Sequence, residues 1–294
     1  MKTILFLTRV YFKFLNAIDS KTAGKKAFRL FQKTNLSKIK PKEKKYLLSS
    51  STFKIQTEFG KIACYENGDP QKSTFLLVHG WNSNAGSLGL ISDELVKKGY
   101  HTISFDLPAH GNNSNTHTNL LECKEVMKTI LKRIRTSEPI SIISHSFGSL
   151  ITSYALSELS IQTNHLVFLT SPQKSKHIFD FFKETVQLSD KAYHHMITLA
   201  SNLLKEPLSK VNACDKLLLA NFNHLTLIHE KKDKVLPFQN SVFINENIEN
   251  STLVALEKVG HYRMLWNNKV LEEIMKAVQH SMAKKDEPIK ALQI

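Results

Sequence analysis

The sequence has few cysteines, and their positions exclude disulfide-rich and zinc-binding classes of protein. It contains three cysteines, Cys64, Cys123 and Cys214, which are far apart, odd in number and without a Cys-x-x-Cys pair. This usage argues against a disulfide framework or a structural zinc site, and it leaves three ordinary thiols in a reducing compartment. We therefore expect a cytoplasmic protein, with peripheral association with a membrane as a further hypothesis.

Signals for membrane spanning, nucleotide binding and metal binding are also missing. The apolar stretch near the N-terminus is interrupted by Arg9 and Lys13, too early for a transmembrane helix, and the Ala-x-Ala-like spacing of a signal-peptide cleavage site is missing. Glycine-rich phosphate loops are missing as well. The pairs His194-His195 and His224…His229 have no carboxylate or cysteine at a recognisable ligand spacing. We predict no metal and no cofactor.

Acidic residues are scarce at the N-terminus, and this scarcity explains the basic character of the chain. Residues 1–50 contain 13 Lys and Arg against 2 Asp and Glu, a charge of +11, whereas the remaining 244 residues contain 27 against 24, a charge of +3. The basicity therefore belongs to an N-terminal segment. Because the rest of the chain has neither a basic face nor a recognition motif, we predict no nucleic-acid partner.

Residues 1–48 are predicted to form a basic, amphipathic helical appendage. Apolar residues recur at helical spacing up to Ser20, and a second basic segment with apolar residues runs from Lys21 to Asn35. A charged linker at 38–45 is expected to separate the appendage from the body. Residues 1–35 either lie on an anionic membrane surface or pack their apolar stripe on the rest of the protein. The oligomeric state stays open.

The segment around Ser146 carries the strongest signal for chemistry. The β-type run Pro139–Ile143 leads into Ser144-His145-Ser146-Phe147-Gly148, and a helix-like stretch follows. A strand, a tight turn at a serine and a helix together form a nucleophile elbow, which projects the hydroxyl towards a base. Gly148 fits the crowded trailing position of the turn, and Ser144 occupies the leading position, where glycine is more common.

Two further residues complete a candidate catalytic triad in the order Ser, Asp, His. Asp233 follows the strand-like run Leu225–Glu230, and His261 follows the run Ser251–Leu256. In a parallel sheet the carboxyl ends of the strands lie along one edge, where ligands bind. Glu230 is a rival for the acid, because it lies only three residues before Asp233.

These motifs together resemble the α/β-hydrolase fold superfamily, in particular its serine-nucleophile, esterase- and lipase-like branch. The acid loop Asp233-Lys-Val-Leu-Pro237, the His79-Gly80-Trp81 loop and the turn Asp106-Leu-Pro-Ala-His-Gly111 match that pattern over about residues 55–280. The resemblance implies that the backbone N–H groups of Trp81 and Phe147 form the oxyanion hole. It also implies that His79 is structural and that Asp106 caps a turn.

The fold class implied is α/β. Residues 49–294 are expected to form a mostly parallel eight-stranded sheet flanked by helices, with a helical lid inserted at 172–223. The apolar residues of this insertion either line an acyl or alcohol pocket or form the insertion's own core. They are Phe179, Phe181, Phe182, Tyr193, Met196, Ile197, Leu199, Leu203 and Leu204.

The function expected from the sequence is cleavage of a carboxylic ester or thioester of a small-molecule acyl substrate. Ser146 acts as nucleophile, His261 as general base and Asp233 as the residue that orients it, through an acyl-enzyme and without a cofactor. Alternatives on the same triad are an acyltransferase, a C–C hydrolase and an aminopeptidase. From another class, a non-catalytic receptor with the hydrolase fold remains an alternative.

Overall fold

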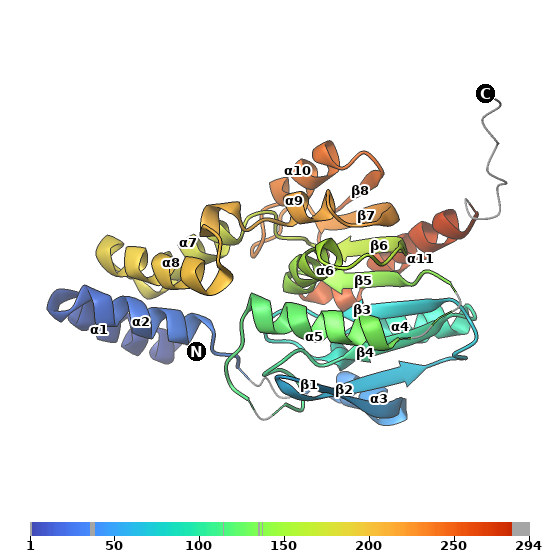
Figure 1. Ribbon diagram of the computed structural model, residues 1–294, viewed down its shortest axis with the longest axis horizontal. Coiled ribbons are helices and arrows are strands. Elements are labelled where there is room, and N and C mark those ends of the chain that lie inside the picture. The colour runs from blue at the N-terminus through green and yellow to red at the C-terminus, as the bar shows by residue number, and fades with distance from the viewer. Residues whose placement is uncertain (1, 36–38, 114, 135, 137, 284–294) are drawn as a thin grey trace.

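The computed structural model describes residues 2–35, 39–113, 115–134, 136 and 138–283. An eight-stranded sheet lies at the centre, with helices on both faces, and three N-terminal helices precede it (Figure 1). The strands are β1 (Ser51–Thr57), β2 (Gly60–Asn67), β3 (Thr74–Val78), β4 (His101–Phe105), β5 (Ser141–His145), β6 (Thr163–Leu169), β7 (Phe222–Glu230) and β8 (Ser251–Leu256). The α/β class and the mostly parallel eight-stranded sheet predicted from the sequence are confirmed.

The strand order explains where ligands can reach the sheet. The order is β1-β2-β4-β3-β5-β6-β7-β8; β1 and β2 run antiparallel, as do β2 and β4, and all other neighbours are parallel. The chain passes from β3 to β4 on one side and then returns to place β5 on the other side of β3. This reversal opens a crevice beyond the carboxyl ends of β3 and β5, the usual position of a ligand site in such sheets.

Both faces of the sheet are buried because the central strands are apolar on both sides. All residues of β3, β4, β5 and β6 are buried, as expected for parallel strands covered on two faces. Alternate residues of one strand enter different cores: Leu76 packs with α5 and α6, and Leu77 packs with α4 and α11. These helices are α4 (Gly89–Lys97), α5 (Leu120–Arg133), α6 (Phe147–Ser157) and α11 (Asn268–Ala283).

The insertion between β6 and β7 is helical, and it contacts the N-terminal helices. It contains α7 (Ser175–Val186), α8 (Asp190–Leu204) and α9 (Ala213–Leu217), while α10 (Gln239–Asn247) lies between β7 and β8. The helices α1 (Lys2–Ile18) and α2 (Ser20–Phe31) lie beside α7 and α8, away from the sheet (Figure 1).

Small side chains allow α2 to approach α8 closely. Ala23, Gly24 and Ala27 are fully buried in this contact. A Cβ atom added to Gly24 would lie 2.6 Å from the carbonyl oxygen of Ala192, so any larger residue there would push the helices apart. The apolar stripe of α2 therefore packs on the rest of the protein, which is the second of the two alternatives given above.

The prediction that the charged run at 38–45 forms a linker is wrong for most of this run, because residues from Pro41 onward form a helix. Residues 36–38 lie outside the described part of the chain, but α3 (Pro41–Ser49) begins at Pro41 and is held by Glu43, whose carboxylate accepts from the backbone N–H of Lys40 over 2.9 Å. Proline at the first helical position and an acidic residue in the first turn both favour a helix start. Buried Tyr46 anchors α3 to β4 through Ser104.

Candidate active site

Ser146 lies at a sharp turn between β5 and α6. Its backbone is in an unusual conformation, with φ 53° and ψ −120°, and its N–H donates to the carbonyl of Leu169 over 2.9 Å. A residue forced to positive φ stores strain, which the surrounding structure must maintain. The turn therefore projects the Ser146 side chain out of the sheet edge.

Glycine at 148 is required by the close approach of β3. A Cβ atom at this position would lie 2.6 Å from the carbonyl oxygen of Val78 and 2.7 Å from that of His79. At the leading position, where glycine is more common, Ser144 is fully buried and its Oγ lies 2.7 Å from Oγ1 of Thr152 on α6. A hydroxyl is tolerated there because the adjoining helix supplies a partner for it.

His261 connects Ser146 to Asp233 through a continuous chain of hydrogen bonds. Nε2 of His261 lies 3.1 Å from Oγ of Ser146, and Nδ1 lies 2.8 Å from Oδ2 of Asp233. An ionised carboxylate can only accept, so Nδ1 donates, and in a neutral ring Nε2 is then free to accept the hydroxyl proton of Ser146. The structure thus brings together the three residues selected from the sequence.

The Asp233 carboxylate is fully buried and well supplied with donors. Its Oδ1 accepts from the N–H groups of Val235 and Leu236 over 2.7 and 3.0 Å, and Nε2 of His229 lies 3.6 Å from Oδ2. Burial alone would raise the pKa of Asp233, but the interactions with His229 and His261 outweigh it and hold the pKa well below its ordinary value. Asp233 is therefore ionised.

Glu230, the rival acid, has a different task. Its Oε1 accepts from the N–H of Lys258 over 3.0 Å, and its Oε2 accepts from the N–H of Gly260. Both donors belong to the loop that precedes His261. Glu230 therefore fastens the loop that carries His261 and does not contact the imidazole in this arrangement. The pairing of a strand-end glutamate with a loop so distant in sequence has no local sequence signal.

The loop after β3 faces Ser146 from the other side. Gly80 permits this approach, because a Cβ atom there would lie only 3.2 Å from Cβ of Ser146. Trp81 packs its ring edge-to-face against Phe147, with centroids 5.3 Å apart. Phe147 is the first residue of α6, so its N–H has no acceptor within the helix, and the helix N-terminus carries partial positive charge.

Two buried histidines fix the shape of this loop. The N–H of Leu107 donates to Nε2 of His79, and the N–H of Asn82 donates to Nε2 of His110, each over 3.0 Å. Burial lowers the pKa of His79 to about 4, and it is the main cause that lowers the pKa of His110 to about 3. Both rings are therefore neutral acceptors, and they tie the loops that follow β3 and β4 together. Asp106 accepts from the N–H groups of Ala85 and Asn112 and so caps these turns, as expected.

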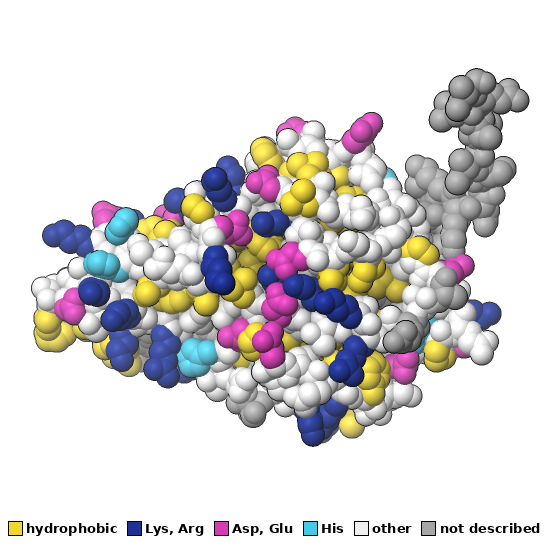
Figure 2. Space-filling view, viewed as in Figure 1, with side chains coloured by type: hydrophobic (Ala, Val, Ile, Leu, Met, Phe, Trp, Pro, Cys, Tyr) yellow, Lys and Arg dark blue, Asp and Glu magenta, His cyan; other side chains and the backbone are white. Residues whose placement is uncertain are grey.

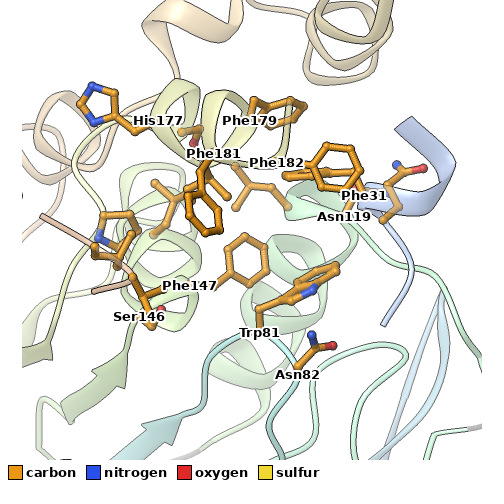
Figure 3. Close-up of a pocket in the computed structure, with 18 of the residues that line it drawn as sticks. Phe31, Trp81, Asn82, Asn119, Ser146, Phe147, His177, Phe179, Phe181 and Phe182 are labelled. Atoms are coloured by element: carbon orange, nitrogen blue, oxygen red, sulfur yellow. The ribbon is translucent and has the colours of Figure 1, made fainter. Parts of the chain in front are cut away.

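A cavity of about 760 Å³ opens beside Ser146. Figure 3 shows Ser146 to the left of Phe147 and Trp81, with Phe179, Phe181 and Phe182 of α7 above them. Its walls are largely apolar, and they include residues of α6, the insertion and α2. The apolar lining residues include Phe28, Phe31, Phe147, Leu150, Phe179, Phe181, Phe182, Leu203, Leu204 and Leu208.

Part of this cavity comes from a segment that sequence reasoning did not place there. Phe31 of α2 packs on Phe179 and Phe182 of α7, with centroids 4.1 and 5.3 Å apart. The N–H of Asn35 donates to Oδ1 of Asn82 in the loop after β3, over 2.8 Å. The amphipathic pattern of α2 indicated that one face would be buried, but no sequence signal indicated that this face would reach the cavity.

The insertion divides its apolar residues between the two roles left open by the sequence. Phe179, Phe181, Phe182, Leu203 and Leu204 line the cavity. Met196 is fully buried in the main core near α2, where Ala192 and Ala200 accompany it. Part of the insertion therefore lines the cavity, and part of it packs on α2 instead of forming a core of its own.

Comparisons with known proteins identify the fold of the chain. The family model described as alpha/beta hydrolase fold matches residues 73–191, a range that includes Ser146 and ends before Asp233. No curated protein matches the chain.

Solved structures of similar fold cover most of the chain. An esterase of Pyrococcus furiosus is 19% identical, with a TM-score of 0.64, over 85% of this chain and 97% of that one. A membrane phospholipase A described as a bacterial virulence factor is 15% identical, with a TM-score of 0.62, over 82% and 89%. A carboxylesterase of Nitrososphaera gargenis is 15% identical, with a TM-score of 0.60, over 79% and 100%. On its sheet, its strand order and these matches, the chain has the α/β-hydrolase fold.

Proposed function

We propose that the protein is a serine hydrolase that cleaves a carboxylic ester or thioester through an acyl-enzyme. The observation that carries this proposal is the unbroken hydrogen-bond chain from Asp233 through His261 to Ser146, which opens into an apolar cavity. This arrangement of a buried carboxylate, an imidazole and a serine at a strained turn is a catalytic triad suited to acyl transfer. The similar solved structures include proteins named esterase, phospholipase and carboxylesterase, which agrees with this reaction class.

In the first half of the reaction Ser146 Oγ attacks the carbonyl carbon of the substrate, and His261 Nε2 takes the hydroxyl proton. Asp233 holds the imidazole in the required tautomer and stabilises the imidazolium. The C–O or C–S bond then breaks as His261 returns the proton to the leaving alcohol or thiol. An ester of Ser146 is left.

The second half reverses these roles with water as the nucleophile. His261 takes a proton from water, the hydroxide attacks the acyl carbon, and the proton returns to Ser146 Oγ as the acid leaves. The backbone N–H groups of Trp81 and Phe147 hold the oxyanion in both halves. Each such donor lowers the barrier by roughly 3 kcal/mol.

The apolar cavity favours a substrate with a hydrocarbon acyl chain or alcohol. Phenylalanines from α2 and α7 offer dispersion contacts and no fixed polar partner for a charged group deep in the cavity. Burying each additional methylene contributes about 0.8 kcal/mol. We therefore expect kcat/KM to increase with acyl length until the chain fills the cavity.

A fluorophosphonate tests the proposal directly, because it phosphonylates only an activated serine. Wild-type protein should gain one adduct by intact mass, on the peptide that contains Ser146, and Ser146→Ala should gain none. Ser153→Ala, at a buried serine of α6, is the matched control and should label like wild type. Wild-type protein that stays unlabelled, with and without detergent, would favour a non-catalytic receptor and overturn the proposal.

A further inference from the structure

Most of the large apolar side chains of α1 face solvent, whereas two of its polar side chains bind the rest of the protein. Arg9 donates from Nε to the carbonyl of Thr185 over 2.8 Å, and Asn16 accepts from Oγ of Ser189 over 3.2 Å, so both polar side chains bind at the end of α7 and the start of α8. Phe12 of α1 is buried as part of the core. An ordinary surface helix has the opposite arrangement.

The outward face of α1 is broad and continuous. Phe14 is 68% exposed, Ile18 is 65% exposed and Leu7 is 60% exposed, and at 100° per residue the exposed apolar positions span an arc of about 160°. Contiguous apolar surfaces of this kind mark places where something else binds. The large side chains of the face are Ile4, Phe6, Leu7, Val10, Tyr11, Phe14 and Ile18.

Positive charge lies next to this face. Lys13 is exposed at the edge of the arc, and the exposed side of α2, which packs on α1, carries a row of Lys and Arg. Asp19 is the only acidic residue among residues 2–35. Figure 2 shows these Lys and Arg side chains gathered over the end of the molecule where α1 and α2 lie, with hydrophobic side chains at its tip. The exposed basic residues of α2 and the segment after it are Lys21, Lys25, Lys26, Arg29 and Lys33.

We propose that the apolar face of α1 docks on the surface of an anionic lipid bilayer, with the basic row of α2 contacting the headgroups. An amphipathic helix with Lys and Arg at its borders lies in the plane of the membrane interface and buries its apolar side chains there. Each basic residue near an anionic leaflet adds to the attraction, and added salt screens it. A second copy of this chain fits less well, because a symmetric contact through α1 would bring two basic rows together. No helix among the described residues is long and apolar enough to span a membrane.

Docking would bring the bilayer close to the cavity. The helix α2 contacts α1 and also supplies Phe28 and Phe31 to the cavity wall. Other lining side chains are themselves apolar and exposed, among them Phe181 and Leu203. The docking surface stands independently of the proposed hydrolysis, but it gives a lipid-borne acyl chain a short route to Ser146.

Co-sedimentation with vesicles tests the docking surface on the full chain. Wild-type protein should sediment with phosphatidylcholine vesicles that contain phosphatidylglycerol. The variant Leu7→Ser/Phe14→Ser/Ile18→Ser should partition at least about tenfold less, because three large side chains no longer enter the interface. The matched control is Leu48→Ser/Leu218→Ser/Leu219→Ser, which changes three equally exposed leucines elsewhere and should sediment like wild type.

A charge variant separates the electrostatic part of the binding. Lys21→Gln/Lys25→Gln/Arg29→Gln should lose affinity for vesicles with phosphatidylglycerol, and its binding should depend less on added salt than wild-type binding does. The proposal would be overturned if the wild-type protein stays in the supernatant. It would also be overturned if the α1 variant and the charge variant both sediment like wild type. A dimer in sedimentation velocity that the α1 variant dissociates would assign the face to a second copy and would also overturn it.

A fluorescent reporter locates the contact without relying on the loss of binding. The native cysteines are all buried, so an environment-sensitive dye can be attached at Phe14→Cys and, as a control, at Leu218→Cys. The dye on α1 should shift to the blue when vesicles are added, and the control dye should not. Equal responses would contradict docking through α1.

The same proteins distinguish failure of this proposal from failure of the proposed hydrolysis. Ser146→Ala should sediment with vesicles like wild type. The α1 variant should keep its fluorophosphonate adduct in buffer without vesicles, because the substituted residues lie outside the cavity and the serine turn. A protein that binds vesicles but never labels would retain the docking surface and lose the hydrolase.

Discussion

The carbonyl oxygen of His261 accepts a hydrogen bond from Nε2 of His145 over 2.9 Å. His145 directly precedes Ser146, and the His261 ring faces the Ser146 hydroxyl, so this bond fixes the backbone of His261 beside the serine. A carbonyl can only accept, so Nε2 of His145 carries the proton. Burial and the nearby His261 lower the pKa of His145 to about 3, which keeps the ring neutral. The serine turn and the histidine loop are therefore fixed to each other directly.

We expect His145 to act as a positioning residue for the proposed reaction. His145→Phe removes the donor, and kcat for a p-nitrophenyl ester should decrease at least about fivefold, the equivalent of one neutral hydrogen bond, with little change in KM. His145→Gln, which can still donate, should recover part of the loss. The exposed His194→Gln should behave like wild type. Equal activity of the Phe and Gln variants would contradict positioning through this bond.

The proposed role of Asp233 can be tested while its shape is retained. Asp233→Asn should lower kcat by about 10⁴-fold, because a neutral amide neither enforces the tautomer of His261 nor stabilises the imidazolium. The kinetics should be measured beside circular dichroism to verify the fold. A decrease of less than tenfold with intact fold would mean that Asp233 does not act on His261.

Glu230 is expected to act on stability and on the order of the His261 loop. Glu230→Ala leaves the N–H groups of Lys258 and Gly260 without this carboxylate, and the free energy of unfolding should decrease by about 2 kcal/mol in urea denaturation. Glu257→Ala is the control, because its ion pair with Lys231 is exposed and should be worth less than about 1 kcal/mol. Indistinguishable unfolding curves for the two variants would contradict the anchoring role.

The cavity wall contributed by α2 should set the acyl-length preference. Phe31→Ala removes the contacts with Phe179 and Phe182, and kcat/KM for long-chain p-nitrophenyl esters should decrease about tenfold, while acetate and butyrate esters change little. Phe243→Ala, at an exposed phenylalanine of α10, serves as the control. A uniform decrease for all chain lengths would indicate general destabilisation instead.

Three buried neutral histidines should make the fold sensitive to mild acid. The pKa of His79 is lowered to about 4, and those of His110 and His145 to about 3, in each case mainly by burial, from an ordinary value of 6.5. As the pH falls below 6.5, these histidines take up protons in the unfolded chain but not in the folded protein. The free energy of unfolding therefore becomes smaller as the pH falls. At pH 5 each histidine costs roughly 2 kcal/mol.

Urea denaturation at pH 7 and pH 5 measures this effect. Asp233 does not contribute in that window, because its lowered pKa keeps it ionised in the folded protein down to values below 3.8. The exposed His194→Gln should leave the pH dependence unchanged, and His110→Gln should reduce it. A free energy of unfolding that is flat between these pH values would contradict the neutral buried rings.

The sequence by itself determined the sheet and the three residues at its edge. Alternating β and helical patterns predict parallel strands, and Ser146, Asp233 and His261 each follow such a strand. Their meeting is a consequence of the strand register, since His145 pairs with Leu169 and Leu169 with Ile228 at the same level. Local pattern is sufficient here because a parallel sheet collects all its carboxyl ends at one edge.

Only the tertiary structure decided what covers each amphipathic face. The pattern of residues 2–35 predicts apolar faces on two helices, yet Gly24 and Ala27 bury the face of α2 against α8, while Phe14 of α1 points into solvent. The same holds for Phe31 in the cavity and for Glu230 under the His261 loop. Periodicity fixes the direction of a side chain around its own helix or strand, but the partner comes from a segment more than a hundred residues away, or across a loop, and depends on packing.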